Sequence, residues 1–280
     1  MPRRTSVTLT AVRIARFVHP GSARAQSGVL WGTVEGGGPD APMDALTVAA
    51  IDGHPFGPLS FTGDRWALPD VRLLSPILPS KVVAIGKNYV DHVREMGGDT
   101  APETPLIFLK PSTSVIGDGD AIRLPPSSSE VHYEGELAAI IGRPARNVAP
   151  EEALSYVLGY AAANDVTARD QQRADGQFTR SKGYDSFCPL GPWLETDLDP
   201  SDVRLTTRVN GTVVQDGRTS QMVHDLPAQL AFMSGVMTLL PGDVILTGTP
   251  SGVGPIQDGD SVSVEIEGIG TLTNPVVKAT

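Results

Sequence analysis

The sequence predicts a mainly β fold with short helices, preceded by a small β-rich segment at the N-terminus. Its 280 residues include 30 glycines and 24 prolines, and turn-forming residues in such numbers are typical of many short strands. Short apolar or alternating runs recur along the chain, and turn residues bound each of them. No internal repeat or coiled-coil heptad interrupts this pattern. Short strands joined by tight turns are therefore the expected building units.

Composition and charge narrow the classes of function. Apolar residues make up 40% of the chain and charged residues 19%, as in soluble globular proteins. The net charge of -10 argues against nucleic acid or an anionic membrane as a partner, because both require a basic patch. The chain shows neither a signal peptide nor a run of roughly 18 apolar residues that could span a membrane, so a cytoplasmic protein is expected. The single cysteine, Cys188, excludes an internal disulfide and is predicted to be buried and unreactive in its apolar setting.

The first 77 residues are the predicted N-terminal β domain, and residues 78–280 are a second, larger domain. Residues 12–18 alternate apolar and basic side chains, which predicts a half-buried strand, and residues 28–34 predict another. This segment offers no evident chemistry. His19 and His54 lie among turn residues and are expected at the surface.

A buried strand predicted over residues 81–86 leads directly into a short helix over residues 89–96. On this helix His92 and Glu95 are three positions apart, so their side chains face the same way and can form a hydrogen bond. A carboxylate on one imidazole nitrogen raises the basicity of the other, as a general base requires. The alternative is an incidental pair on a solvated helix. Two glycines follow as a hinge, so the helix could act as a lid.

The next predicted strand, residues 105–113, carries Lys110 near its end. This lysine either extends to solvent or faces an anion such as a substrate. Two Asp-Gly-Asp sequences, at residues 118–120 and 258–260, resemble cation ligands at first sight. Asp-Gly between strands is more simply a hairpin turn, so we predict hairpins at both places.

The stretch from His132 to Gly142 predicts a strand on which two carboxylates lie side by side. Side chains alternate across a strand, so Glu134 and Glu136 point to the same face. If that face is buried, the two negative charges repel each other unless a cation lies between them. A hard divalent cation with oxygen ligands would resolve the repulsion. The alternative is a solvated strand face with two ordinary glutamates.

A third carboxylate follows at the end of the next predicted strand. A helix over residues 149–158 leads into an apolar strand that ends at Asp165. Asp165 could complete a set of three ligands with Glu134 and Glu136. Three carboxylates suit Mg²⁺ or Mn²⁺ better than zinc, which prefers His and Cys. Residues 171–186 are polar and predict a loop, either functional or merely solvated.

The C-terminal part predicts a hairpin, a helix and a glycine-rich segment. An Asn-Gly turn at residues 210–211 joins two short strands. In residues 241–254, glycines and threonines allow the backbone to approach a ligand closely. Asp225 caps a helix that runs to about Met237, and its expected buried residues are Leu226, Leu230, Met233 and Met237.

Five blocks, in one order, resemble the fumarylacetoacetate hydrolase superfamily. They are Gly86-Lys87-Asn88-Tyr89 with His92 and Glu95, and then residues 108–111, 133–137, 164–170 and 241–250. The resemblance covers residues 78–280, and residues 1–77 look like the small N-terminal domain of the shorter bacterial members. It implies a mixed β-sandwich roll that forms a homodimer.

The resemblance also implies roles for individual residues. It places one Mg²⁺ or Mn²⁺ per subunit on Glu134, Glu136 and Asp165, and it makes His92 and Glu95 a catalytic dyad on the lid. Where the full-length eukaryotic enzyme has a further aspartate ligand this chain has Asn88, so water is expected to complete the metal site. It implies that Arg169, Gln172 and Lys182 face the substrate, with Thr249 near the substrate carboxylate. Lys110 is expected to bind the substrate as well.

The substrates of this family share a 2-oxo-carboxylate end, or its 2-hydroxy-dienoic form, and a bound cation would stabilise a pyruvate enolate. One such site could hydrolyse an acylpyruvate, with His92 activating water and Lys182 stabilising the oxyanion. It could also decarboxylate oxaloacetate, or isomerise 2-hydroxyhepta-2,4-diene-1,7-dioate or 5-carboxymethyl-2-hydroxymuconate. The dyad favours C–C cleavage, because isomerisation alone needs no activated water. A non-catalytic, metal-stabilised binding scaffold is a further alternative, against which the dyad and Lys182 argue.

Overall fold

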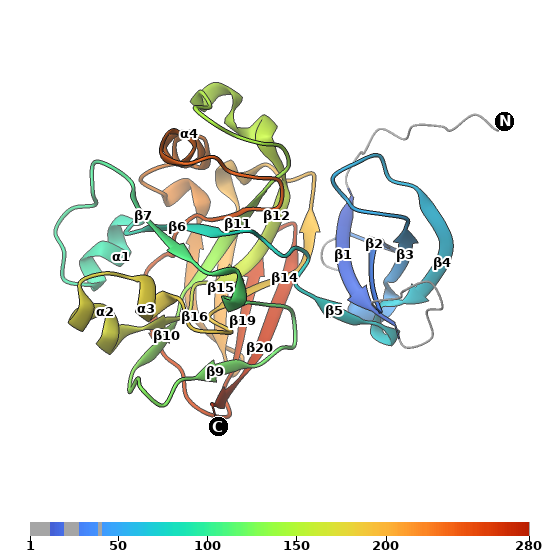
Figure 1. The fold of residues 1–280 in the computed structure, drawn as a ribbon. Helices are drawn as coiled ribbons and strands as arrows, with labels where there is room; N and C mark the ends of the chain where they lie inside the picture. The colour runs from blue at the N-terminus through green and yellow to red at the C-terminus, as the bar shows by residue number, and fades with distance from the viewer. Residues whose placement is uncertain (1–11, 20–27, 39–40, 280) are drawn as a thin grey trace.

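The structure is a computed structural model that describes residues 12–19, 28–38 and 41–279. Most of its regular structure is β-strand and its helices are short, which confirms the predicted fold class (Figure 1). The longest helix, α4, spans the 11 residues Leu226–Val236. Within the described ranges, no helix combines the length and the apolar character needed to cross a membrane.

A sheet of 12 strands forms most of the scaffold, in the order β4-β3-β2-β1-β14-β12-β11-β17-β6-β7, with β5 beside β1 and β8 beside β14. Its N-terminal strands are β1 (Arg13–Val18), β2 (Val29–Glu35), β3 (Thr47–Ile51), β4 (Phe61–Ala67) and β5 (Arg72–Leu74). The others are β6 (Val82–Gly86), β7 (Leu106–Lys110), β8 (Val115–Ile116), β11 (Gly135–Ile141), β12 (Val157–Asn164), β14 (Cys188–Glu195) and β17 (Val244–Leu246).

The N-terminal strands extend this sheet instead of forming a sheet of their own. Figure 1 shows β1 to β4 together on one side of the molecule. β1 connects them to the rest through antiparallel pairing with β14, in which Arg13 lies opposite Glu195 and Ile14 opposite Leu194. The division of the chain into two domains near residue 77 stays a prediction.

Two smaller sheets complete the fold, and the larger of them packs against the 12-stranded sheet. The first has the order β16 (Thr212–Arg218), β15 (Arg204–Val209), β19 (Ser261–Ile266), β20 (Gly270–Lys278), β9 (Ile122–Leu124). The second has the order β13 (Thr167–Ala168), β10 (Val131–Tyr133), β18 (Gly254–Pro255). Leu137 of β11 belongs to the same buried apolar cluster as Leu205 of β15 and Val264 of β19, so the core lies between two sheets.

The remaining helices are α1 (Val90–Glu95), α2 (Arg169–Asp175) and α3 (Thr179–Lys182), which Figure 1 shows on one side of the large sheet. Within the described residues, six 3-10 helices cover Met43–Ala45, Leu68–Asp70, Ser112–Ser114, Pro150–Tyr156, Pro200–Asp202 and Thr219–Gln221. The Asp225 side chain accepts the N–H of Ala228 at 2.9 Å, which confirms the predicted cap of α4. The Asn-Gly hairpin between β15 and β16 is also confirmed, with φ of 51° at Asn210 and 80° at Gly211.

Three local predictions were wrong. The Asp-Gly-Asp sequences at residues 118–120 and 258–260 do form turns, but the strands on either side pair with other strands: β8 with β14, β9 with β20, β18 with β10. Turn residues determine where the chain reverses, but they do not determine which strands pair. Residues 171–186 contain the end of α2 and the whole of α3 instead of a loop, with Gly176 ending α2 at a φ of 66°.

The predicted burial of Cys188 is confirmed. The residue begins β14 and its side chain is fully buried. Burial raises the pKa of the Cys188 thiol to about 12, so it stays protonated at neutral pH.

Candidate metal centre and active site

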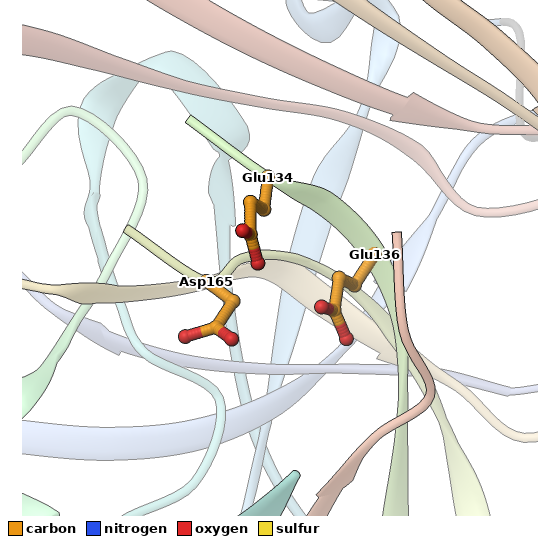
Figure 2. A group of neighbouring side chains, drawn as sticks. All are labelled: Glu134, Glu136 and Asp165. Atoms are coloured by element: carbon orange, nitrogen blue, oxygen red, sulfur yellow. The ribbon is translucent and has the colours of Figure 1, made fainter. Parts of the chain in front are cut away.

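Three carboxylates from neighbouring strands converge in the interior. Glu134 lies between β10 and β11, Glu136 is the second residue of β11, and Asp165 directly follows β12. β11 and β12 are antiparallel neighbours, with Glu136 opposite Ala163. One carboxylate oxygen from each residue lies within 4.8 Å of the other two, and all three side chains are buried. Figure 2 shows the three side chains beside one another. The structure thus brings the predicted metal ligands together.

The strand predicted over residues 132–142 is interrupted where the first ligand lies. β10 ends one residue before Glu134 and β11 starts one residue after it. Glu134 donates its N–H to Asn164 Oδ1 at 2.9 Å, and its carbonyl accepts the N–H of Asp165 at 2.8 Å. The next residue, Gly135, has no room for a side chain, since an added Cβ would lie 2.1 Å from a hydroxyl on the facing β15. These contacts bring Glu134 and Asp165 together.

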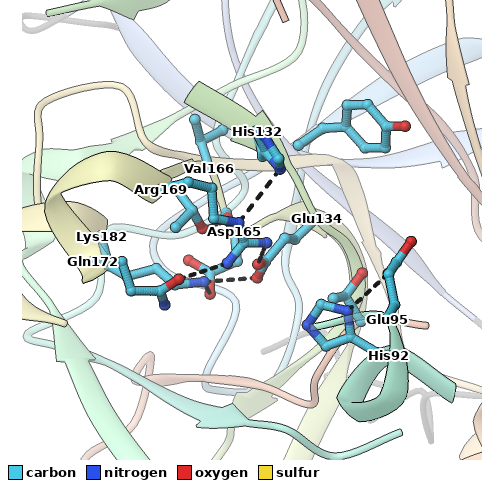
Figure 3. A network of polar contacts seen from close by, with 12 residues as sticks. His92, Glu95, His132, Glu134, Asp165, Val166, Arg169, Gln172 and Lys182 are labelled. Carbon is cyan, nitrogen blue, oxygen red and sulfur yellow. Dashed lines mark hydrogen bonds and ion pairs between the residues drawn. The ribbon is translucent and has the colours of Figure 1, made fainter. Parts of the chain in front are cut away.

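Three buried cations surround two of the carboxylates. Lys110, the last residue of β7, donates to Asp165 Oδ1 at 2.5 Å. Lys182, the last residue of α3, lies 2.6 Å from Glu134 Oε2 and 2.6 Å from Asp165 Oδ2 (Figure 3). Arg169, the first residue of α2, forms an ion pair with Glu134. Although burial alone would raise it, the charges of Arg169 and Lys182 hold the pKa of Glu134 well below its usual range.

Glu136 has a different environment. It accepts the N–H of Gly248 at 2.7 Å, but it forms no ion pair with any described residue. Burial and then the charges of Asp165 and Glu134 raise the pKa of Glu136 well above its usual range. A cation beside Glu136 would relieve this repulsion, and three carboxylates offer the oxygen ligands that hard divalent cations prefer. The donor set therefore fits Mg²⁺ or Mn²⁺.

The amide of Asn88 is committed to backbone groups close to this centre. Its Nδ2 donates to the carbonyl of Thr247 at 2.8 Å and to that of His224 at 3.0 Å, and its Oδ1 accepts the N–H of His224 at 2.9 Å. Asn88 thereby holds the turn after β6 against two distant segments. Completion of the metal shell by water stays a prediction.

His92 and Glu95 form the expected pair on α1, with His92 Nδ1 3.2 Å from Glu95 Oε2 (Figure 3). A carboxylate only accepts, so Nδ1 carries the proton and Nε2 keeps its lone pair. Burial lowers the pKa of His92, although Glu134 and Glu95 act in the opposite direction. At neutral pH the imidazole is therefore uncharged, which is the state that can accept a proton.

Glu134, Glu136 and His92 open onto one cavity of about 230 Å³. Ligand pockets commonly measure roughly 300–1,000 Å³, so this cavity suits a small metabolite. Arg169 and Gln172 are joined in its wall by a hydrogen bond of 2.8 Å from Nη1 to Oε1. Seven of the predicted site residues line it, namely His92, Glu134, Glu136, Arg169, Gln172, Lys182 and Thr249.

The other three predicted residues lie behind this wall. Asp165 and Lys110 contact each other, and Lys110 is only 1% exposed, so its amine supports Asp165 and does not reach the cavity. Glu95 lies behind His92. In the wall itself, the hydroxyl of Thr249 donates to the carbonyl of Gly135 at 2.8 Å, so its proton is committed to the backbone.

His132 contributes to the site although the sequence did not single it out. Arg169 Nε donates to His132 Nδ1 at 3.4 Å (Figure 3). His132 Nε2 lies 3.1 Å from Glu130 Oε1. His132 therefore supports the guanidinium that pairs with Glu134. Strand alternation could have revealed it, because it lies two positions before Glu134.

Backbone N–H groups are the second contribution that sequence reasoning missed. Gly248 donates to Glu136 at 2.7 Å and Gly252 donates to Glu95 at 2.9 Å. The glycine-rich composition of residues 241–254 indicated close backbone approach but not which groups would be approached. The two glycines thus orient one expected ligand and one member of the dyad.

Two family models match the chain. A model described as Fumarylacetoacetate (FAA) hydrolase C-terminal matches residues 81–277. A model described as Rv2993c-like, N-terminal matches residues 12–76. Together they account for most of the described chain.

Individual relatives are similar over most of the chain. Protein Rv2993c of Mycobacterium tuberculosis is 55% identical over 271 residues, which are 95% of this chain and 98% of that protein. The X-ray structure of 5-carboxymethyl-2-hydroxymuconate delta-isomerase from Mycobacterium smegmatis has 56% identity and a TM-score of 0.85, over 95% of this chain and 100% of that chain. The mitochondrial oxaloacetate tautomerase FAHD2A of Homo sapiens is 44% identical over 221 residues, 74% of this chain and 70% of that protein.

Proposed function

The chain belongs to the fumarylacetoacetate hydrolase family, and on this basis we propose that it is an enzyme of 2-oxo acids that transfers a proton at C3, the carbon next to the keto group. The observation that carries the proposal is the position of His92. A neutral imidazole, oriented by Glu95, opens onto the same cavity as Glu134 and Glu136. A base and a cation site in one small cavity suit the formation of an enolate.

Glu134, Glu136 and Asp165 would hold Mg²⁺ or Mn²⁺. The cation, when bound, would stabilise the negative charge that develops on the keto oxygen. The protein's own part is to hold the three carboxylates in place. Lys110 and Lys182 orient Asp165, and the backbone around Gly248 orients Glu136.

Proton transfer is assigned to His92. Since Nδ1 is bound to Glu95, Nε2 is the nitrogen that can take a proton from C3, and the Glu95 carboxylate would then stabilise the imidazolium. Lys182 is unsuited to act as the base. Although burial disfavours its charge, Asp165 and Glu134 raise the pKa of Lys182, so it stays protonated and stabilises negative charge instead.

Arg169 and Gln172 would hold the substrate carboxylate. The guanidinium of Arg169 is positioned by Glu134, His132 and Gln172. Because Gln172 Oε1 accepts from Arg169, its Nε2 remains as a donor for a substrate oxygen. Together they direct donor groups from α2 into the cavity wall.

The fate of the enolate decides the reaction. Two of the relatives are named as an isomerase and a tautomerase, and such reactions return the proton at another position. We therefore take isomerisation or keto–enol tautomerisation of a 2-oxo acid as the leading reaction. C–C cleavage, which the sequence favoured, is the second candidate, because the same His92–Glu95 dyad could activate water against an acylpyruvate.

The test measures two reactions, tautomerisation and pyruvate release, each with Mg²⁺, with Mn²⁺ and with EDTA. The rate that the metal gives without protein is subtracted. Ultraviolet absorbance reports the enol–keto conversion of oxaloacetate, and a coupled assay reports pyruvate released from oxaloacetate and acetylpyruvate. Metal-dependent tautomerisation without pyruvate supports the leading reaction, whereas pyruvate from either acid assigns cleavage. If no metal-dependent turnover of any of these acids occurred, the proposal would be wrong.

Two variants on α1 test whether the activity depends on His92. His92→Ala should lower the rate by about 100-fold or more, the usual contribution of a general base. Arg94→Ala is the matched control, because Arg94 lies on the same helix with a side chain that is 66% exposed and pairs only with Asp91 among described residues. An equal loss in both variants would contradict the assignment of His92.

We also propose a homodimer, as the family resemblance implies. Light scattering of the purified protein would test it. A mass near 29.5 kDa, that of a single chain, would contradict this proposal.

A further inference from the structure

Lys87 lies in the cavity wall with its charge uncompensated. It is exposed, directly follows β6, and forms no side-chain hydrogen bond or ion pair within the described residues. The wall also contains Lys182 and Arg169, and each of them forms an ion pair with Glu134. Lys87 is therefore the cation of the wall that can accept a further negative charge.

The backbone holds Lys87 in an unfavourable conformation. Its φ of 59° is in the left-handed region, which glycine and asparagine adopt more easily than lysine. β6 precedes it, and the next residue, Asn88, is held by hydrogen bonds to Thr247 and His224. A strained residue held firmly from both sides is typical of functional sites, where the strain places a side chain.

The catalytic cavity adjoins a second cavity at Lys87. The second one measures about 560 Å³, and Lys87, Phe108 and Phe178 line both. The two aromatic rings meet edge to face with centroids 5.3 Å apart. The remaining wall of the second cavity includes the exposed apolar side chains of Leu106 and Leu109 on β7. A substrate longer than the catalytic cavity would thus pass Lys87, with its carbon chain against aromatic rings.

We propose that Lys87 selects 2-oxo acids that carry a second carboxylate at the far end of the chain. The inference rests on the proposed function, in which the 2-oxo-carboxylate end lies at Glu134, Glu136 and Arg169. A distal carboxylate would then meet the one uncompensated cation of the wall, whereas an alkyl or aryl end would leave that amine without a partner. The substrate class is therefore a short 2-oxo dicarboxylic acid or its enol.

Two acids of equal chain length test this inference. 2-Oxoglutarate and 2-oxopentanoate have the same five-carbon chain and differ only in the terminal carboxylate. Calorimetry with the Mg²⁺-loaded protein should show that 2-oxoglutarate binds about 5- to 10-fold more tightly, the range for one charged contact. Lys87→Asn accepts the left-handed backbone but removes the charge, so it should abolish the preference. Lys87→Arg should retain it, as should Lys278→Asn, which removes an exposed lysine at the end of β20.

Equal affinity of the natural protein for the two acids would overturn the inference, and so would a preference that survives in Lys87→Asn. If neither acid bound, the KM values of oxaloacetate and acetylpyruvate in the same variants would replace the calorimetry, and a Lys87-independent ratio would again overturn it. The two proposals fail separately. Turnover without a Lys87-dependent preference contradicts only the inference, and a Lys87-dependent preference without turnover contradicts only the proposed function.

Discussion

The backbone N–H of Gly252 donates to Glu95 Oε1 at 2.9 Å and joins segments that are 157 positions apart. The other oxygen of this carboxylate lies 3.2 Å from His92 Nδ1. Gly252 has a φ of 99°, and an added Cβ would lie 2.1 Å from the carbonyl oxygen of Val214, so glycine is required there. Glu95 is thereby held between the short helix α1 and the loop that joins β17 to β18, and the imidazole is held with it.

Tyr133 should influence the dyad through this loop. Its hydroxyl donates to the carbonyl of Gly252 at 2.7 Å. Tyr133→Phe removes one hydrogen bond, worth roughly 0.5–1.5 kcal/mol, so we expect kcat to fall by up to about tenfold with little change in KM. Steady-state kinetics checks this. Tyr184→Phe is the control, because it removes a hydroxyl that bonds to Gln171, away from the dyad; an equal fall in kcat there would contradict the positioning role.

The fall of kcat/KM at low pH, the acid limb of the pH profile, should reflect the protonation of His92. Burial lowers the pKa of His92 below the ordinary value of 6.5. The charge of Arg169 also lowers this pKa, whereas Glu134 and Glu95 raise it. A base must be unprotonated, so kcat/KM should fall only as the pH drops through this lowered pKa, below 6.5. Glu95→Gln removes a charge that raises the pKa, so the limb should move to lower pH while the rate falls. A limb that moved upward in this variant would show that another group controls it.

Metal should stabilise the fold through Glu136. Mg²⁺ or Mn²⁺ at 100 times its Kd adds about 2.7 kcal/mol to the free energy of unfolding, which EDTA should reverse. Glu136→Gln removes the repulsion with Asp165 and Glu134 and can keep the bond from Gly248, so without metal its Tm should at least equal that of the natural protein. Thermal melts check both points. A metal response of full size in Glu136→Gln would refute the ligand assignment.

Asn88→Asp should destabilise the protein without adding a metal ligand. The carboxylate would face the carbonyl oxygens of Thr247 and His224, to which the amide now donates. Buried acceptors that lose their donor, together with a buried charge, are expected to cost about 3 kcal/mol of the free energy of unfolding. Urea denaturation measures the loss, and metal titration measures the affinity. Unchanged stability with tighter metal binding would mean that this position can act as a ligand.

Several parts of the fold and site followed from local patterns. Glu134 and Glu136 were expected on one face because their spacing matches the period of a strand, and Asp165 because it ends the next strand. The cap at Asp225 and the Asn210–Gly211 hairpin also depend on neighbouring residues alone. In each case the pattern behind the prediction spans only a few positions of the chain, so it is visible in the sequence.

The sequence by itself determined the strand periods, the turns and caps, and the spacing that points carboxylates and a histidine to particular faces. Only the tertiary structure decided what lies opposite those faces: Lys110 and Lys182 beside Asp165, Gly252 beside Glu95, and Lys87 at the junction of two cavities. The physical reason is the separation in sequence between the residues that interact. Steric and hydrogen-bonding rules act between neighbours, whereas the partners of a buried charge come from strands and helices that are distant in sequence and meet only when the sheets pair and pack.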